Sequence, residues 1–122
     1  MIILKGSLRS HWIQYITSID MNVNPADIPG SNLSFKFYRL MNTLDTKYIQ
    51  PGFQFNHKMN WQVQSYYQPS ILHLKWVNGY ERKYSMGTAT WEDIKKEIEY
   101  INRHVEFERM LEGQDDEFED EM

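Results

Sequence analysis

The side chains that could carry out acid–base, nucleophilic or metal chemistry are few, and they are spread along the chain. The four histidines stand at positions 11, 57, 73 and 104, without the short shared spacing that suggests metal ligands. Glu92 and Asp93 are adjacent carboxylates, but they open a predicted helix, where acids interact favourably with the helix dipole. No glycine-rich phosphate loop and no Gly-x-Ser-x-Gly elbow is present. The sequence therefore predicts no enzyme, no cofactor and no metal site.

Cysteine chemistry is excluded because the 122-residue chain contains no cysteine. Disulfides, thiolate zinc sites, cysteine-bound iron–sulfur clusters and cysteine nucleophiles are impossible in it. Aromatic residues, in contrast, are plentiful, with four Trp, eight Tyr and six Phe. This is more than the core of one domain of this size needs, so we expect some of them at an interface. No apolar run approaches the roughly 20 residues of a membrane span.

The segment 35–39 places two cations among three aromatic residues, in the order Phe-Lys-Phe-Tyr-Arg. Lysine and arginine neutralise phosphates, and exposed aromatic rings stack on unpaired bases, so this pattern is typical of RNA contact. A simpler interpretation is that Phe37 belongs to the core while Lys36 and Arg39 solvate a helix. The residues alone leave both interpretations open.

The charges divide unequally along the chain. Residues 1–90 carry nine basic and four acidic residues, or +5, whereas residues 91–122 carry four basic and 13 acidic residues, or −9. We therefore expect the first part to face phosphate and the C-terminal end to face protein or solvent. The candidates for RNA contact are six of these nine basic residues and one histidine: Lys5, Arg9, His11, Lys36, Arg39, Lys47 and Lys58.

A hairpin followed by a helix is the unit around which the chain is organised. Alternation predicts a strand over 71–77, Asn78-Gly79 predicts a turn, and a second strand is predicted over 80–86. Thr90 caps a predicted helix, with Asp93 three residues further on. We predict one continuous core from the apolar residues of the first strand and the helix: Leu72, Leu74, Trp76, Ile94, Ile98 and Ile101.

The register of this hairpin depends on its loop. A two-residue loop would pair Val77 with Tyr80 and place Leu74 opposite Lys83. One additional residue, inserted as a bulge, places Leu74 and Trp76 on the face of Arg82 and the residues that alternate with it. We predict the bulge, with Gly79 in the left-handed conformation.

The earlier part of the chain predicts two helices and two further strands. The first helix has Ser7 as its cap and an apolar stripe of Leu8, Trp12, Tyr15, Ile16 and Ile19. A short strand over 21–23, a loop over 26–31 and a second helix from Asn32 to about Tyr48 follow, and Pro51-Gly52 ends that helix. Residues 53–56 are expected to be extended or irregular, and a strand is predicted over 61–66.

These elements predict an α+β fold with a four-stranded sheet flanked by helices, including an N-terminal helix. Residues 1–111 form the predicted domain. The last helix is predicted to continue through the end of this domain until Gly113. Residues 112–122 hold seven acidic and no basic side chains. Within this acidic tail, Gln114 to Met122 is too charged to fold by itself.

Several segments together resemble one family. The opening MIILKGSLRSHWIQYI resembles the N-terminus of mitochondrial small-subunit ribosomal protein twenty-five, through Lys5, Gly6, Gln14, Tyr15 and Ile16. The segments FKFYR, QPGFQFNHKMNWQVQ, PSILHLKWVNG and TWEDIKKEIEYI follow that family in the same order. Each motif is short, and the resemblance rests on their collinearity over roughly residues 1–105.

The resemblance implies a thioredoxin-like domain with a mixed sheet and without the redox dithiol. The same fold is shared by a mitochondrial large-subunit ribosomal protein and by an accessory subunit of respiratory complex I. It implies a structural role in the mitochondrial matrix, on the small ribosomal subunit, with ribosomal RNA and neighbouring ribosomal proteins as partners and no small-molecule substrate.

The chain departs from this family in two places. Some members carry C-terminal cysteines that bind an iron–sulfur cluster, and this chain has none, so the cluster is not carried over. The segment between Tyr38 and Ile49 is also longer than in the relatives. The alternative function is that of the complex I accessory subunit, while a thioredoxin-like enzyme is opposed by the lack of cysteine.

Overall fold

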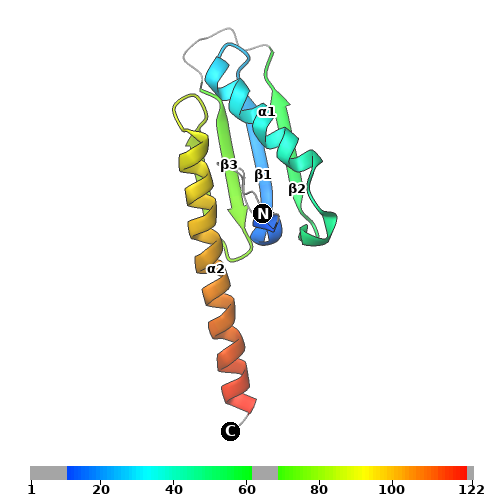
Figure 1. Cartoon of the computed structure of the whole chain (residues 1–122), viewed down its shortest axis with the longest axis vertical. Helices are drawn as coiled ribbons and strands as arrows, with labels where there is room; N and C mark the ends of the chain where they lie inside the picture. The colour runs from blue at the N-terminus through cyan, green and yellow to red at the C-terminus, as the bar shows by residue number, and fades with distance from the viewer. Residues whose placement is uncertain (1–10, 62–68, 121–122) are drawn as a thin grey trace, which may run out of the picture.

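The computed structural model describes residues 11–61 and 69–120, which form an α+β fold with a four-stranded mixed sheet and two α-helices (Figure 1). This confirms the predicted fold class at that level. The elements, in chain order, are the 3-10 helix η1 (Trp12–Tyr15), β1 (Ile16–Val23), α1 (Ile28–Asn42), the 3-10 helix η2 (Thr46–Tyr48), β2 (Gln54–Met59), β3 (Ile71–Trp76), β4 (Glu81–Ser85) and α2 (Trp91–Asp120).

The sheet has the strand order β2-β1-β3-β4. β1 and β2 are parallel, with α1 as the connection between them, whereas β3 is antiparallel to both β1 and β4. The chain therefore consists of a βαβ unit followed by a ββα unit, joined side by side through β1 and β3.

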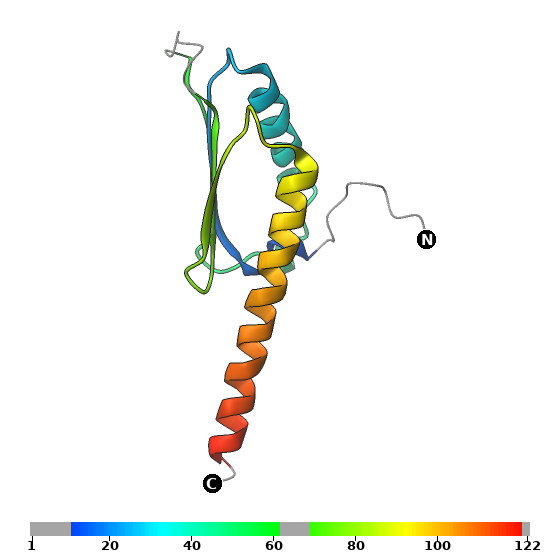
Figure 2. The ribbon, with the colours of Figure 1, turned by 90° about the vertical axis from the view of Figure 1, so that its left-hand side faces the viewer.

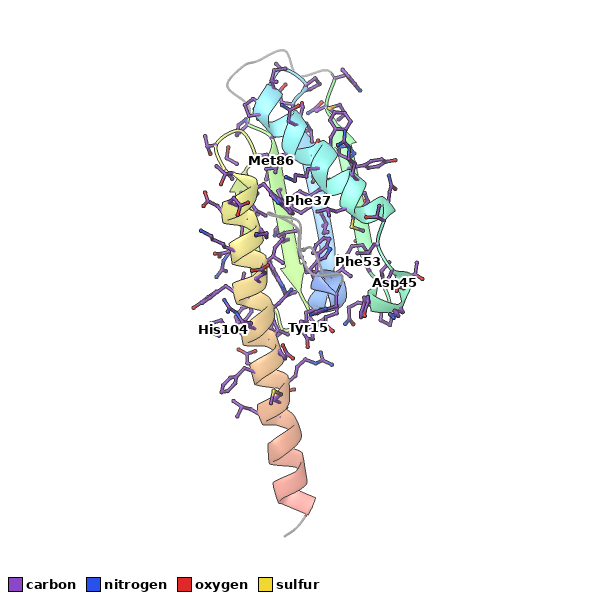
Figure 3. All side chains as sticks on the ribbon, in the orientation of Figure 1. Tyr15, Phe37, Asp45, Phe53, Met86 and His104 are labelled. Carbon is purple, nitrogen blue, oxygen red and sulfur yellow. The ribbon has the colours of Figure 1, made fainter. Side chains whose placement is uncertain are left out.

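Both helices lie on the same face of the sheet, as the edge-on view in Figure 2 shows. The residues of β1 and β3 that point to this face are buried, and they form one cluster with the apolar stripe of α2. Leu72, Leu74 and Trp76 are in this cluster, as are Ile94, Ile98 and Ile101, so the predicted core is confirmed. Phe37 of α1 and Met86, which follows β4, complete the layer between helices and sheet (Figure 3).

The hairpin has the predicted register and turn. Leu74 pairs with Arg82 and Leu72 with Tyr84, and Gly79 has a φ of +90°. The Trp76 N–H donates to the carbonyl of Tyr80 at 2.8 Å, so three residues form the loop. A residue with a side chain is strained at this φ, which is why glycine suits the position.

The last helix begins as predicted and ends later than predicted. Thr90 Oγ1 accepts a hydrogen bond of 3.2 Å from the Asp93 N–H, which is the capping interaction. The helix does not end at Gly113 but continues to Asp120, across the predicted boundary at residue 112. Extending an existing helix avoids the cost of nucleation, which explains how a charged segment joins it. Figures 1 and 2 show that this end of α2 projects well beyond the sheet.

The predicted N-terminal helix is wrong in its second half. Of its described residues, Trp12–Tyr15 are helical, as a 3-10 turn, and the chain enters β1 at Ile16. The reason is a register shift in β1 between Ile16 and Ser18. A bulge there separates the buried residues Ile16 and Ile19 by three positions, which imitates a helical spacing. The predicted cap and first turn lie outside the described residues.

The second helix begins earlier and ends earlier than predicted. The Asp27 side chain accepts a hydrogen bond of 3.1 Å from the Gly30 N–H, so Pro29 and Gly30 belong to the first turn of α1 and not to a loop. Proline suits this turn because its missing N–H has no partner there in any helix. The helix ends at Asn42, and only the 3-10 turn η2 follows before Pro51.

The strand that pairs with β1 on the outside is β2, Gln54–Met59, in a segment that we expected to be extended or irregular. Its inward positions are Phe55, His57 and Met59, and only two of these three are apolar. The strand predicted over 61–66 begins with Trp61, which lies in a turn, and its remaining residues are outside the described part of the chain.

Candidate functional site

The structure places the predicted RNA-contact residues on separate surfaces. Lys36 and Arg39 are exposed on α1, His11 and Lys47 lie at the two 3-10 turns, and Lys58 is exposed on β2. Lys5 and Arg9 lie outside the described residues. The sequence therefore identified exposed cations, but it did not identify one continuous site.

On α1, the aromatic residues divide between core and surface. Phe37 is buried, as the simpler interpretation required, while Phe35 and Tyr38 are exposed. The Lys36 ammonium lies 4.9 Å from the centre of the Trp91 ring, which is a cation–π distance. This surface combines Lys36 and Arg39 with the exposed ring of Phe35, so it retains the elements of phosphate and base contact.

At the 3-10 turns, the cation is already paired within the chain. Lys47 Nζ lies 3.6 Å from Asp45 Oδ2 and 5.1 Å from the centre of the Tyr48 ring. The ring of His11 lies 6.2 Å from the same tyrosine. An exposed ion pair gains little energy, but it lowers the local positive charge. We therefore rank this region below the others for phosphate contact.

The sheet face opposite the helices is a flat polar surface, which we call the open face. No helix of the described residues covers it (Figure 2). The strand register arranges its residues in three rows across the four strands: Gln54, Ser18, Lys75 and Glu81; then Asn56, Asp20, His73 and Lys83; then Lys58, Asn22, Ile71 and Ser85.

The open face contains more cations than anions. Lys58, Lys75 and Lys83 are exposed on it, against Asp20 and Glu81. Glu81 Oε1 also lies 3.6 Å from His73 Nε2, so one of the two carboxylates faces a histidine. None of the residues in these three rows is Phe, Tyr or Trp. The chemistry of the open face suits contact with phosphate by ammonium groups, without base stacking.

Lys75 and Lys83 were not among the residues that the sequence predicted to form a site. The signal was present, because Lys75 alternates with Leu74 and Trp76 and must therefore point away from the core. What the sequence did not contain was the order of the strands, which places β4 and β2 on opposite sides of β1 and β3. Without that order, the three lysines could not be assigned to one surface.

The hairpin turn and α2 are joined by a carboxylate. Glu108 accepts hydrogen bonds from the Tyr80 hydroxyl at 2.6 Å and from Asn78 Nδ2 at 2.7 Å. These two bonds lower the pKa of Glu108, and the bond to Glu108 raises the pKa of Tyr80. The arrangement is a structural tie between elements, because both of its donors lie at the turn of the hairpin.

The described residues offer neither a metal site nor a helix that could span a membrane. No group of three or more histidine or acidic side chains in this part of the chain is placed to hold a metal ion. Of the helices described, none is both long enough and apolar enough to cross a membrane.

Comparison with known proteins adds no family. No family model matches the sequence, and no curated protein matches it either.

Proposed function

We propose that this protein is a non-catalytic structural constituent of the small subunit of the mitochondrial ribosome, located in the matrix, where it contacts ribosomal RNA and neighbouring proteins. The observation that carries the proposal is the placement of charge. Within the described residues, exposed cations lie on α1 and on the open face, while the projecting end of α2 belongs to a segment rich in acids. The first part is suited to phosphate and the second is suited to protein.

The topology supports the thioredoxin-like part of this proposal. A parallel βαβ unit joined to an antiparallel ββα unit, in the order β2-β1-β3-β4, is the arrangement expected of a thioredoxin-like domain. In such a domain without cysteine, no redox step is available, and the scaffold serves binding. The mitochondrial and ribosomal parts of the proposal rest on the resemblance described above.

RNA contact alone would give weak attachment. The open face contributes three lysines, and each phosphate contact weakens as salt rises. Burial of exposed aromatic side chains against neighbouring proteins supplies the remaining affinity. Phe35 and Trp61 are both at least half exposed, so they are available for such burial.

The second candidate function is that of an accessory subunit of respiratory complex I, which shares the resemblance and the implied fold. Such a subunit would be held by protein contacts, and the lysines of the open face would not contact RNA. Charge reversal on this face therefore separates the two functions.

The test reverses two lysines of the open face, Lys58→Glu with Lys83→Glu, in the tagged full-length chain. We expect the variant to fold, because both side chains are exposed, and to leave the small subunit at lower salt than the wild type. Log affinity falls as log salt rises, and each lost phosphate contact should make the slope of that fall less steep by roughly 0.7–0.9. Lys5→Glu with Arg9→Glu should act in the same direction.

The matched control for each single reversal, Lys58→Glu or Lys83→Glu made alone, is Lys96→Glu, which changes the same charge at an exposed position of α2. We expect this control to assemble with the salt dependence of the wild type. Equal behaviour of the open-face variants and the control would contradict RNA contact by the open face. Association of the wild type with complex I instead of the small subunit would contradict the proposed function itself.

A further inference from the structure

α2 carries a second apolar stripe besides the one in the core. Tyr100, Phe107, Met110 and Leu111 are exposed to 53%, 59%, 59% and 43% of their surface. Phe107 follows Tyr100 by seven positions and precedes Leu111 by four, so these residues share one side of the helix. We call Tyr100, His104, Phe107, Met110 and Leu111 the α2 stripe.

The α2 stripe is continuous and hollowed. The rings of Tyr100 and His104 lie 4.5 Å apart, edge to face, and His104 stands on the outer side of the helix (Figure 3). Tyr100, Arg103, His104 and Phe107 line a hollow of about 240 Å³. Adjacent exposed apolar side chains of this size mark an interaction site more often than isolated ones do.

The end of the stripe has no support from the rest of the described chain. Val105 is the last residue of α2 in the buried cluster, and the helix then continues past the sheet (Figure 2). At 30 residues, α2 is about 45 Å long. Phe107 therefore lies beside the point where the hairpin turn holds Glu108, and Met110 and Leu111 lie beyond it, on the projecting part of α2.

The charge beside the stripe selects the kind of partner. Residues 100–122, which include the whole stripe, contain nine acidic residues and two basic residues, Arg103 and Arg109. Glu106 and Glu112 are exposed next to the apolar side chains, while Glu108 is held by the hairpin turn. The same end of α2 from a second copy, an RNA backbone and an anionic lipid surface would all bring negative charge to this place.

We propose that the α2 stripe is the docking site for a basic amphipathic helix of another protein. The apolar face of that partner helix covers Phe107, Met110 and Leu111, and the lysines and arginines of the partner helix contact the carboxylates on either side of the stripe. Apolar anchors supply the affinity in this mode of recognition, and complementary charge supplies orientation and rate. This proposal does not rest on the ribosomal one, because the stripe and its charges are the same in any assembly.

The test measures binding of the full-length chain to a fluorescent synthetic peptide that forms a leucine-faced, lysine-flanked helix. The variant is Phe107→Ala, and its matched control is Phe35→Ala, which removes an equally large ring, 50% exposed, from α1. Loss of a central aromatic anchor should weaken binding by at least about fivefold, whereas the control should bind as the wild type does. A peptide of the same composition with scrambled order should bind at least about fivefold more weakly than the helical peptide, because it presents no apolar face.

Several results would overturn the proposal. These are no binding of the helical peptide, equal binding of the scrambled peptide, and equal binding of Phe107→Ala and the wild type. Dimerisation of the wild type that Phe107→Ala abolishes, in sedimentation equilibrium, would assign the stripe to a second copy. Binding to phosphatidylserine vesicles that depends on Phe107 would assign it to a lipid surface.

Discussion

At the scale of single residues, α2 is held to the sheet by polar side chains as well as by the core. Asn102 accepts a hydrogen bond of 2.9 Å from the indole N–H of Trp76, and its amide donates at 2.9 Å to the carbonyl of Trp12. The residue thus joins α2 to β3 and to η1. A buried indole N–H without an acceptor costs about 1–3 kcal/mol. By accepting this hydrogen bond, the amide of Asn102 avoids that cost and stabilises the fold.

The pH dependence of stability follows from Glu108. Because its pKa is lowered in the folded protein, the ionised form stabilises the fold above the unfolded value of 4.5, and this stability is lost as pH falls below it. We expect the free energy of unfolding, measured with urea between pH 6 and about pH 3, to fall more steeply for the wild type than for Glu108→Gln.

The matched control for this measurement is Glu112→Gln, at an exposed position further along α2. It should keep the pH dependence of the wild type. If Glu108→Gln also keeps it, the hydrogen bonds from Tyr80 and Asn78 do not contribute to folding, and the tie between hairpin and helix is not energetically significant.

The candidate site could be predicted only as residue types. Lys36, Arg39 and Lys58 are exposed, as a hydrophilic side chain in an amphipathic pattern must be. Their separation onto different surfaces depends on the crossover from β1 through α1 to β2, which no local pattern specifies. The open face is therefore a result of the fold and not of any motif.

At the scale of elements, prediction succeeded where the signals were local. The hairpin had a turn dipeptide and clean alternation, and the start of α2 had a cap and an apolar stripe. The strand predicted over 21–23 is the end of β1, and the earlier part of β1 was missed because a bulge shifts its alternation between Ile16 and Ser18. β2 was missed because its inward positions include His57, so its pattern is weakly apolar.

The packing of α2 on the sheet gives a stability prediction. Ile98 is fully buried in the cluster that joins both elements. Ile98→Ala should lower the free energy of unfolding by roughly 2–5 kcal/mol, because it removes transfer energy and leaves a cavity. Urea unfolding measures the change, with Lys96→Ala at an exposed position of the same helix as the control. A cost below about 0.5 kcal/mol for Ile98→Ala would contradict the packing described here.

At the scale of the whole molecule, the fold turns a division of charge along the sequence into a division in space. The sheet and α1 carry exposed cations, and α2 leads away from them into a segment with a large excess of acids (Figure 1). Such a molecule has two different ends for two different partners. We propose phosphate as the partner of the open face and α1, and a basic protein as the partner of the α2 stripe.

The central claim is membership of the mitochondrial small ribosomal subunit, and sedimentation of the tagged wild-type chain from mitochondria tests it most directly. The account predicts that the protein co-sediments with small-subunit ribosomal RNA at low salt and leaves that fraction as salt rises. Migration with respiratory complex I, or sedimentation that ribonuclease treatment and salt both leave unchanged, would contradict the claim.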